Sequence, residues 1–253
     1  MLKKEFFIIL FVLLQTIGLI AQESRFKEGE TLNVWAVSGL NMRDKPDAKA
    51  TKVSTIPYGA KVVVQPNIGL KIPFEVEEFK GFIVKGYWLL VKYGNTEGFV
   101  FDGFLSRLPA PIVGKDTLGL VGYFEKKLGK IGGHFAYSSP PDNDENAIVN
   151  YSQEKVDEGR LCGYYQKYKK GVMYAIKCRD ALSDFKFQIS DATLYEGLFL
   201  IAKDYATYPS MDIKFDSKIK RISLNYTDEN GCGNGITIKQ IGNKIIVHAV
   251  GGC

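Results

Sequence analysis

The sequence predicts a mixed fold: a small all-β barrel followed by an α+β domain with an antiparallel sheet and about two helices. Residues 31–105 contain short apolar alternations separated by Gly, Pro and Asp turns, which is the pattern of a small barrel. Helix-type spacing of apolar residues appears only in the second part, residues 116–253. The length of 253 residues suits two modest domains, and an aromatic content of 13% favours β-rich structure.

Residues 1–21 have the composition of a secretory signal peptide. A positively charged start, Met1–Lys4, precedes an almost unbroken apolar run from Phe6 to Ile20, and Ala21 is a small residue suited to cleavage. We therefore expect a secreted or periplasmic protein with no membrane span after signal cleavage. An uncleaved anchor is the alternative, but the apolar run is short compared with the roughly 20 residues of a spanning helix.

Strands and turns can be assigned along residues 31–105. Alternating apolar residues start at Leu32, and Tyr87–Tyr93 is a strongly apolar strand that ends at a predicted Gly94–Asn95 turn. Between them, Gln65–Gly86 contains two prolines and an acidic patch. This stretch is predicted to be a longer, less regular connection.

Three separated motifs in this segment carry a family resemblance. Gly39–Arg43 reads G-L-N-M-R, Trp88–Val91 reads W-L-L-V, and Glu97–Val100 reads E-G-F-V. In residue type and spacing the segment resembles the bacterial SH3-type (SH3b) domain, with Phe99 where that family usually has Trp. The resemblance covers about residues 31–105 and implies a small barrel that binds a peptide of the cell wall or of a partner protein.

The resemblance also implies a ligand-binding set. Arg43 would meet a carboxylate of the ligand, and aromatic side chains would stack on its chain. An alternative is that Trp88 is simply a core residue. The expected ligand is a peptide or peptidoglycan-like molecule, or an envelope protein, and no cofactor is expected. The candidate binding residues are Asn41, Arg43, Tyr58, Trp88 and Tyr93.

The second half resembles no family that we recognise. Residues 106–115 contain two prolines and read as a stiff linker. One helix is predicted from Thr117 to Leu128, and a second after a cap at Asp191. A hairpin is predicted over residues 161–178 with its turn centred on Lys170, and further strands are expected from residue 185 to 189 and after residue 213.

The four cysteines all lie in this half, and an even number in an exported chain suggests two disulfides with three possible pairings. The hairpin register favours Cys162 with Cys178, which leaves Cys232 with Cys253. The alternative is a Cys162 nucleophile with His248 as its base. A hairpin is an unusual setting for such a thiolate, which normally lies at a helix N-terminus.

Other functions are disfavoured by composition. The net charge of +5 is spread over 33 basic and 28 acidic residues, so no nucleic-acid partner is expected. No metal is expected, because Asp142, Asp144 and Asn146 match a calcium loop but Ala147 and Gln153 replace its essential Gly and Glu. The sequence therefore favours an exported, non-enzymatic binding protein with no catalytic residues. A cell-wall peptidase with a C-terminal Cys/His catalytic domain, or an SH3b barrel that is only a structural spacer, are the alternatives.

Overall fold

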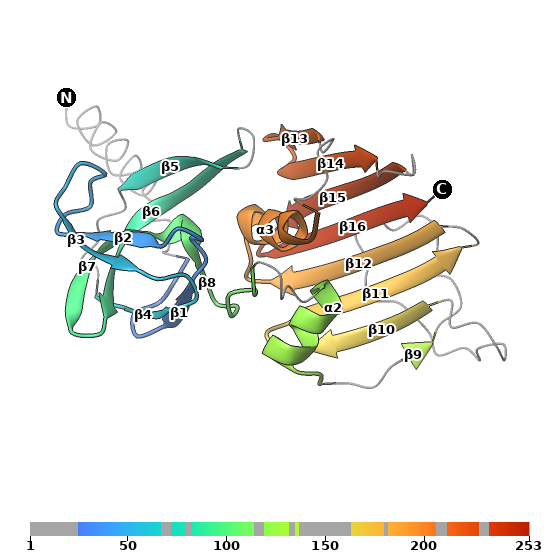
Figure 1. The fold of residues 1–253 in the computed structure, drawn as a ribbon, viewed down its shortest axis with the longest axis horizontal. Coiled ribbons are helices and arrows are strands. Elements are labelled where there is room, and N and C mark those ends of the chain that lie inside the picture. Colours follow the sequence, from blue (N-terminus) through green and yellow to red (C-terminus); the bar gives the residue numbers. More distant parts are fainter. Residues whose placement is uncertain are drawn as a thin grey trace, which may run out of the picture.

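In the computed structural model the chain folds into two antiparallel sheets with helices between them (Figure 1). The structure describes residues 25–66, 72–78, 82–113, 119–131, 135–136, 163–179, 182–205, 212–227 and 233–252. Each sheet has eight strands within these residues. The predicted fold class, a small barrel followed by an α+β domain, is confirmed.

The first sheet curls into the barrel, in the strand order β3-β2-β7-β6-β4-β1-β8, with β5 paired to β6. Its two-residue Gly94–Asn95 turn lies where the sequence predicts it, because Tyr93 pairs with Thr96. The strands are β1 (Thr31–Val34), β2 (Leu40–Arg43), β3 (Lys52–Ile56), β4 (Lys61–Val64), β5 (Pro73–Glu78), β6 (Phe82–Tyr93), β7 (Thr96–Phe101) and β8 (Leu105–Ser106). A short 3-10 helix, η2 (Asp102–Phe104), joins β7 to β8.

The stretch Gln65–Gly86 is more regular than predicted. It contains β5 and the first part of β6, which pair from Pro73 opposite Tyr87 to Glu78 opposite Phe82. The half-buried residues of β5 alternate with exposed ones, which is the period of a strand with one covered face. The prolines and acidic residues obscured this alternation in the sequence. The hairpin extends from the barrel toward β13 and β14 of the second sheet (Figure 1).

The second sheet has the order β13-β14-β15-β16-β12-β11-β10-β9. Gly163 of β10 pairs with Lys177 of β11, so this hairpin is centred on Lys170 as predicted. Lys170 and Gly171 both have positive φ angles, which the turn requires. The strands are β9 (Phe135–Ala136), β10 (Gly163–Tyr168), β11 (Val172–Arg179), β12 (Leu182–Ser190), β13 (Asp212–Asp216), β14 (Arg221–Thr227), β15 (Gly233–Ile241) and β16 (Lys244–Gly252).

Two short helical segments lie against the second sheet. The first consists of α2 (Leu120–Tyr123) and a π-helical turn, η3 (Phe124–Leu128), and ends at Gly129 with a φ of 74°, as predicted. The second is α3 (Leu194–Tyr205). Gly197 lets α3 approach the sheet closely, because a Cβ there would lie 2.8 Å from Ile245 and 2.9 Å from Ile238.

The cap of α3 differs from the prediction by two residues. Thr193 Oγ1 accepts a hydrogen bond from the Glu196 amide, and Glu196 accepts one from the Thr193 amide, which is a capping box. The predicted cap, Asp191, instead adopts a φ of 56° and accepts a hydrogen bond from Asn243 Nδ2. Asp191 therefore belongs to the turn that precedes the helix.

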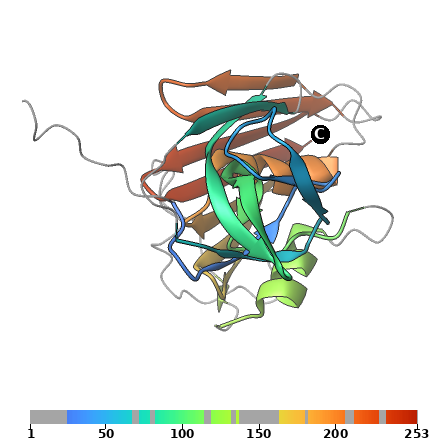
Figure 2. The same cartoon turned by 90° about the vertical axis from the view of Figure 1, so that its left-hand side faces the viewer.

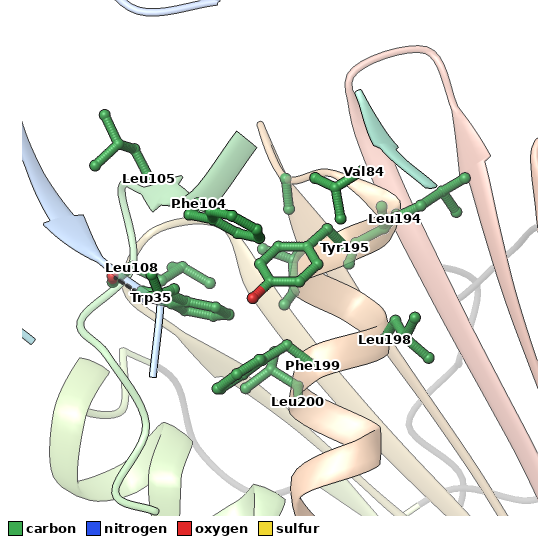
Figure 3. Close-up of a cluster of buried hydrophobic side chains, with 14 of the residues drawn as sticks. Trp35, Val84, Phe104, Leu105, Leu108, Leu194, Tyr195, Leu198, Phe199 and Leu200 are labelled. Atoms are coloured by element: carbon green, nitrogen blue, oxygen red, sulfur yellow. Dashed lines mark hydrogen bonds between the residues drawn. The ribbon is translucent and has the colours of Figure 1, made fainter. Parts of the chain in front are cut away.

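Helix α3 is buried on both sides, because it lies between the barrel and the second sheet (Figures 1 and 2). On the barrel side Trp35 packs against Phe199, and Phe104 packs against Tyr195 (Figure 3). The described residues Leu194–Ala202 are all buried. This agrees with their sequence, which is apolar around most of the helix rather than along one stripe. The two halves of the chain thus share one continuous hydrophobic core.

The segment that was expected to be a linker also packs into this core. Ser106 belongs to β8 and is fully buried, and Leu108 is buried as well. The Leu108 carbonyl accepts a hydrogen bond from Trp35 Nε1 at 3.1 Å (Figure 3). The Tyr123 hydroxyl donates to the Pro109 carbonyl at 2.7 Å. These contacts hold the start of the segment between the two modules.

Several predictions concern parts of the chain that the structure leaves undescribed. The signal peptide, residues 1–21, lies outside the described residues, as do Cys162, Cys232, Cys253 and the side chain of Cys178. None of the helices in the described residues is long and apolar enough to cross a membrane.

Candidate functional site

A groove of about 640 Å³ lies between the barrel and helix α3. Its volume falls in the range of roughly 300–1,000 Å³ that is typical of ligand pockets. Strands β2, β5 and β6 of the barrel and two successive turns of α3 supply its walls. The described lining residues are Ala36, Val37, Ser38, Gly39, Leu40, Asn41, Arg43, Ala48, Phe74, Val76, Glu78, Trp88, Phe101, Phe104, Tyr195 and Phe199.

Aromatic rings form much of the groove surface. Phe74 lies 5.1 Å from Trp88 and 5.3 Å from Phe101, measured between ring centroids. Phe104 meets Tyr195 of α3 edge-on at 5.2 Å (Figure 3). Such tilted and edge-on contacts fix the rings in place, so the aromatic surface is preorganised for a ligand.

The predicted residues Asn41 and Arg43 lie on the polar side of the groove. Arg43 Nη1 donates to the Ala50 carbonyl at 2.6 Å, which orients a half-buried guanidinium. A guanidinium has five N–H donors, so this bond leaves others for a ligand. Asn41 is exposed, and its Oδ1 accepts a hydrogen bond from Thr55 Oγ1 at 3.2 Å.

Trp88, the third predicted residue in the groove, is also part of the core. Only 5% of its surface is exposed. It pairs with Phe101 across β6 and β7, and both side chains line the groove. Trp88 therefore supports the wall of the groove and presents little surface of its own to a ligand.

The other two predicted residues lie away from the groove lining. Tyr58 packs against Phe199 with their ring centroids 6.3 Å apart. Its hydroxyl donates a hydrogen bond to the Pro111 carbonyl at 2.6 Å. Burial raises the pKa of Tyr58 above its usual range. Tyr93 lies at the end of β6, beside the Gly94–Asn95 turn, and packs on the barrel core. The structure thus brings together Asn41, Arg43 and Trp88 but not Tyr58 and Tyr93.

Sequence reasoning missed the residues that complete the groove. Phe74, Val76 and Glu78 come from β5, and their alternation with exposed neighbours was the available signal. Tyr195 and Phe199 come from α3, where their spacing of four residues places them on one face. Nothing in the barrel sequence indicates that this face of α3 packs against the barrel and closes the groove.

Glu78 is the acidic residue among the described lining residues. It follows Phe74 and Val76 on the half-buried face of β5 and pairs with the buried Phe82. Burial raises the pKa of the Glu78 carboxyl. Burial also raises the pKa of Tyr195, and the negative charge of Glu78 raises it further. The Glu78 carboxylate is therefore close enough to interact electrostatically with the α3 side of the groove.

A buried carboxylate, Asp102, lies behind the groove wall. Its Oδ1 accepts a hydrogen bond from the Tyr87 amide at 2.7 Å, and its surface is 5% exposed. Burial raises its pKa from 3.8 to about 6, against the lowering effects of this hydrogen bond and of the Arg25 charge. Asp102 does not line the groove; its hydrogen bond with Tyr87 joins η2 to β6.

A second cavity, of about 780 Å³, lies at the N-terminal end of the described chain. Both arginines of its lining are already paired: Arg107 binds Glu30, and Arg25 binds Glu196 of α3. Phe26 is buried between the two arginines, with guanidinium carbons 4.6 and 5.0 Å from its ring centroid. Both arginines are thus engaged within the protein, and Arg25 links the N-terminal part to α3, so the first groove is the better candidate for a ligand.

The alternative Cys/His site receives no geometric support from the described residues. His248 pairs with Lys186 and Thr237, on the face of β16 opposite the buried Ile245 and Val247 that α3 covers. Its proposed partner Cys162 lies outside the described residues, as does the calcium-like loop at residues 142–153. Within the described part of the chain, no cluster of three His, Cys, Asp or Glu side chains could hold a metal ion.

One family model matches part of this chain. Residues 38–106 match the family model described as the bacterial SH3 domain. The chain carries a bacterial SH3 domain. The matched region begins at the Ser38 edge of the groove and ends at the buried Ser106, while the rest of the chain has no family match. No curated protein and no solved structure matches this chain.

Proposed function

We propose that this chain is an exported, non-enzymatic binding protein whose SH3 domain recognises a peptide or peptidoglycan-like ligand, or an envelope protein, in the groove against α3. The observation that carries this proposal is the convergence of Asn41, Arg43 and Trp88 on one preorganised groove. A bacterial SH3 domain is compatible with a binding or cell-wall-related module.

The groove offers two kinds of contact to such a ligand. The free N–H groups of Arg43 suit a carboxylate, because a guanidinium binds carboxylates with charge-assisted hydrogen bonds. The rings of Phe74, Phe104 and Tyr195 supply apolar surface for the chain of the ligand. Because Tyr195 belongs to α3, the C-terminal domain is part of the site and does more than follow it.

Export is the second part of the proposal. It rests on the signal-type sequence of residues 1–21 and places the protein in a secreted or periplasmic location. In an oxidising compartment the four cysteines would form disulfides. In the second sheet Gly163 pairs with Lys177, and the next residues outward in the sequence are Cys162 and Cys178. Gly233 pairs with Gly252 in the same way, and the next residues outward are Cys232 and Cys253.

We therefore propose the pairs Cys162–Cys178 and Cys232–Cys253. Thiol titration of the non-reduced, denatured exported protein tests whether the cysteines are oxidised, as these pairs require and the Cys162 nucleophile excludes. No free thiol is expected. Two reactive thiols would contradict the disulfide pairs and restore the Cys162 nucleophile as a candidate.

Binding is tested by co-sedimentation of the full mature chain with purified, insoluble bacterial cell-wall fragments. We expect binding that decreases at least about 10-fold in Arg43→Gln, because the carboxylate contact is lost. Lys52→Gln is the matched control, since Lys52 pairs with Arg43 across β2 and β3 but does not line the groove. Absence of binding to wall fragments and to extracted envelope proteins would leave the SH3 domain as a structural spacer.

A further inference from the structure

We propose that the groove selects a ligand that presents a primary ammonium group, which binds at Glu78 between the barrel and α3. The ligand class is a peptide with a lysine-type side chain or a free N-terminus. This inference rests on the proposed function, because it assumes that the groove is the binding site, and it adds the chemical identity of the group that the site selects.

The position of Glu78 in its strand is the first argument. Phe74, Val76 and Glu78 share one half-buried face of β5, whereas Glu75 and Glu77 are exposed on the other. The cross-strand partners of Val76 and Glu78 are the buried Val84 and Phe82. A carboxylate at this position loses hydration that an exposed one keeps, so the site favours a group that compensates its charge.

The charges around Glu78 are the second argument. Glu75, on the exposed face of the same strand, pairs with Lys85 at 2.8 Å. In the ranges that the structure describes, no basic side chain forms an ion pair with Glu78. Arg43, the basic residue of the described lining, is held by the Ala50 carbonyl. Among the described residues, the negative charge of Glu78 is therefore unmatched at the α3 side of the groove.

The surroundings of this charge define the ligand group. Phe74 and Tyr195 line the same groove, and aromatic faces attract cations through their quadrupole. A carboxylate next to aromatic rings favours a compact ammonium that carries an apolar chain. A neutral isostere would leave the Glu78 charge uncompensated, so the groove should discriminate between the two.

Tryptophan fluorescence of the full mature chain tests this selection. The chain has two tryptophans, of which Trp88 lines the groove and Trp35 is fully buried. The probes are acetyl-Ala-Lys-Ala-amide, its norleucine counterpart, and Ala-norleucine-Ala-amide with a free N-terminus. We expect the lysine peptide, the free N-terminal peptide, or both, to bind at least about 10-fold more tightly than the acetylated norleucine peptide. Comparison of the first and third probes identifies the source of the ammonium.

The preference should disappear in Glu78→Gln and persist in Glu78→Asp. Glu77→Gln is the matched control, because Glu77 is the next residue of β5 but points to the exposed face. Far-UV circular dichroism confirms that each variant is folded. Equal binding of ammonium and neutral probes by the wild type, absence of binding by all probes, or a preference that survives in Glu78→Gln would overturn the inference. If wall fragments still bind in an Arg43-dependent manner, the proposed function stands without it.

Discussion

Trp35 of the barrel packs against Phe199 of helix α3, with ring centroids 5.4 Å apart and ring planes tilted by 45°. The indole is fully buried and donates to the Leu108 carbonyl, so the contact joins the barrel, the connecting segment and the second domain. Phe199 also lines the groove. The same side chain thus contributes to the cohesion of the two modules and to the shape of the candidate site.

We expect Phe199→Ala to lower the free energy of unfolding by about 3–5 kcal/mol, because it removes a buried ring between two rigid surfaces. The wild-type protein should unfold in one transition, because its core is continuous. The variant should show two unfolding transitions, one for each module. Urea unfolding followed by tryptophan fluorescence and circular dichroism measures both effects. Val53→Ala is the control, because Val53 is 43% exposed. Coincident transitions with an unchanged midpoint in Phe199→Ala would show that the modules are stable without this contact.

The carboxylate of Glu196 makes a second connection. It is buried in α3, pairs with Arg25, and accepts hydrogen bonds from the Ser106 hydroxyl and the Thr193 amide. Glu196→Ala leaves these groups without their partner and should lower stability by about 3–5 kcal/mol. Thr193→Ala removes the helix cap and one hydroxyl donor to Glu196 but leaves Arg25 and Ser106 in place, and it should lower stability by about 1 kcal/mol. If urea midpoints show equal losses for the two variants, the link to Arg25 and Ser106 adds no stability.

Local turn chemistry explains which parts of the fold could be predicted. The Gly94–Asn95 turn and the turn at Lys170 each fix a hairpin register from a few residues, so the strand pairings follow directly. The helix ending at Gly129 was predictable for the same reason. Asp191 was wrongly expected to be the cap of α3, because an acidic residue two positions before Thr193 satisfies the same local pattern.

The candidate site was only partly predictable, because it is assembled from distant segments. Arg43 and Trp88 belong to motifs of the barrel, but Tyr195 is more than 100 residues away and reaches the groove through packing of α3. Tyr58 shows the opposite effect. Its hydroxyl and ring are engaged by Pro111 and Phe199, contacts that the barrel sequence does not reveal.

Asp102 should make stability depend on pH. Its pKa is raised from 3.8 to about 6 mainly by burial, so between these values the folded state binds more protons than the unfolded state. Stability from this group is therefore complete below about pH 4 and decreases as the pH rises to about 6, by about 3 kcal/mol in total. Asp102→Asn, which keeps an acceptor for the Tyr87 amide, should remove this decrease.

The comparison of Asp102→Asn with the wild type isolates this effect from other titrating groups. Urea midpoints between pH 4 and pH 8 should coincide at the acid end, and the variant should be more stable at pH 8. Glu97→Gln is the control, because Glu97 is exposed on β7. A variant that is less stable than the wild type at pH 8 would show that the ionised Asp102 is stabilising and that the argument has the wrong sign.

Gly86 lies where β6 passes Asp102 and the aromatic wall of the groove. A Cβ at this position would lie 2.2 Å from Asp102 Oδ1, 2.8 Å from the Phe101 ring and 2.9 Å from the backbone nitrogen of Gly103. We expect Gly86→Ala to lower stability by about 1–3 kcal/mol and to weaken wall-fragment binding, because the backbone behind Trp88 must shift. Gly233→Ala, where a Cβ meets nothing within 4 Å, should change stability by less than about 0.5 kcal/mol. Equal urea midpoints for the two variants would mean that this wall adapts without strain, and the groove could then not be called preorganised.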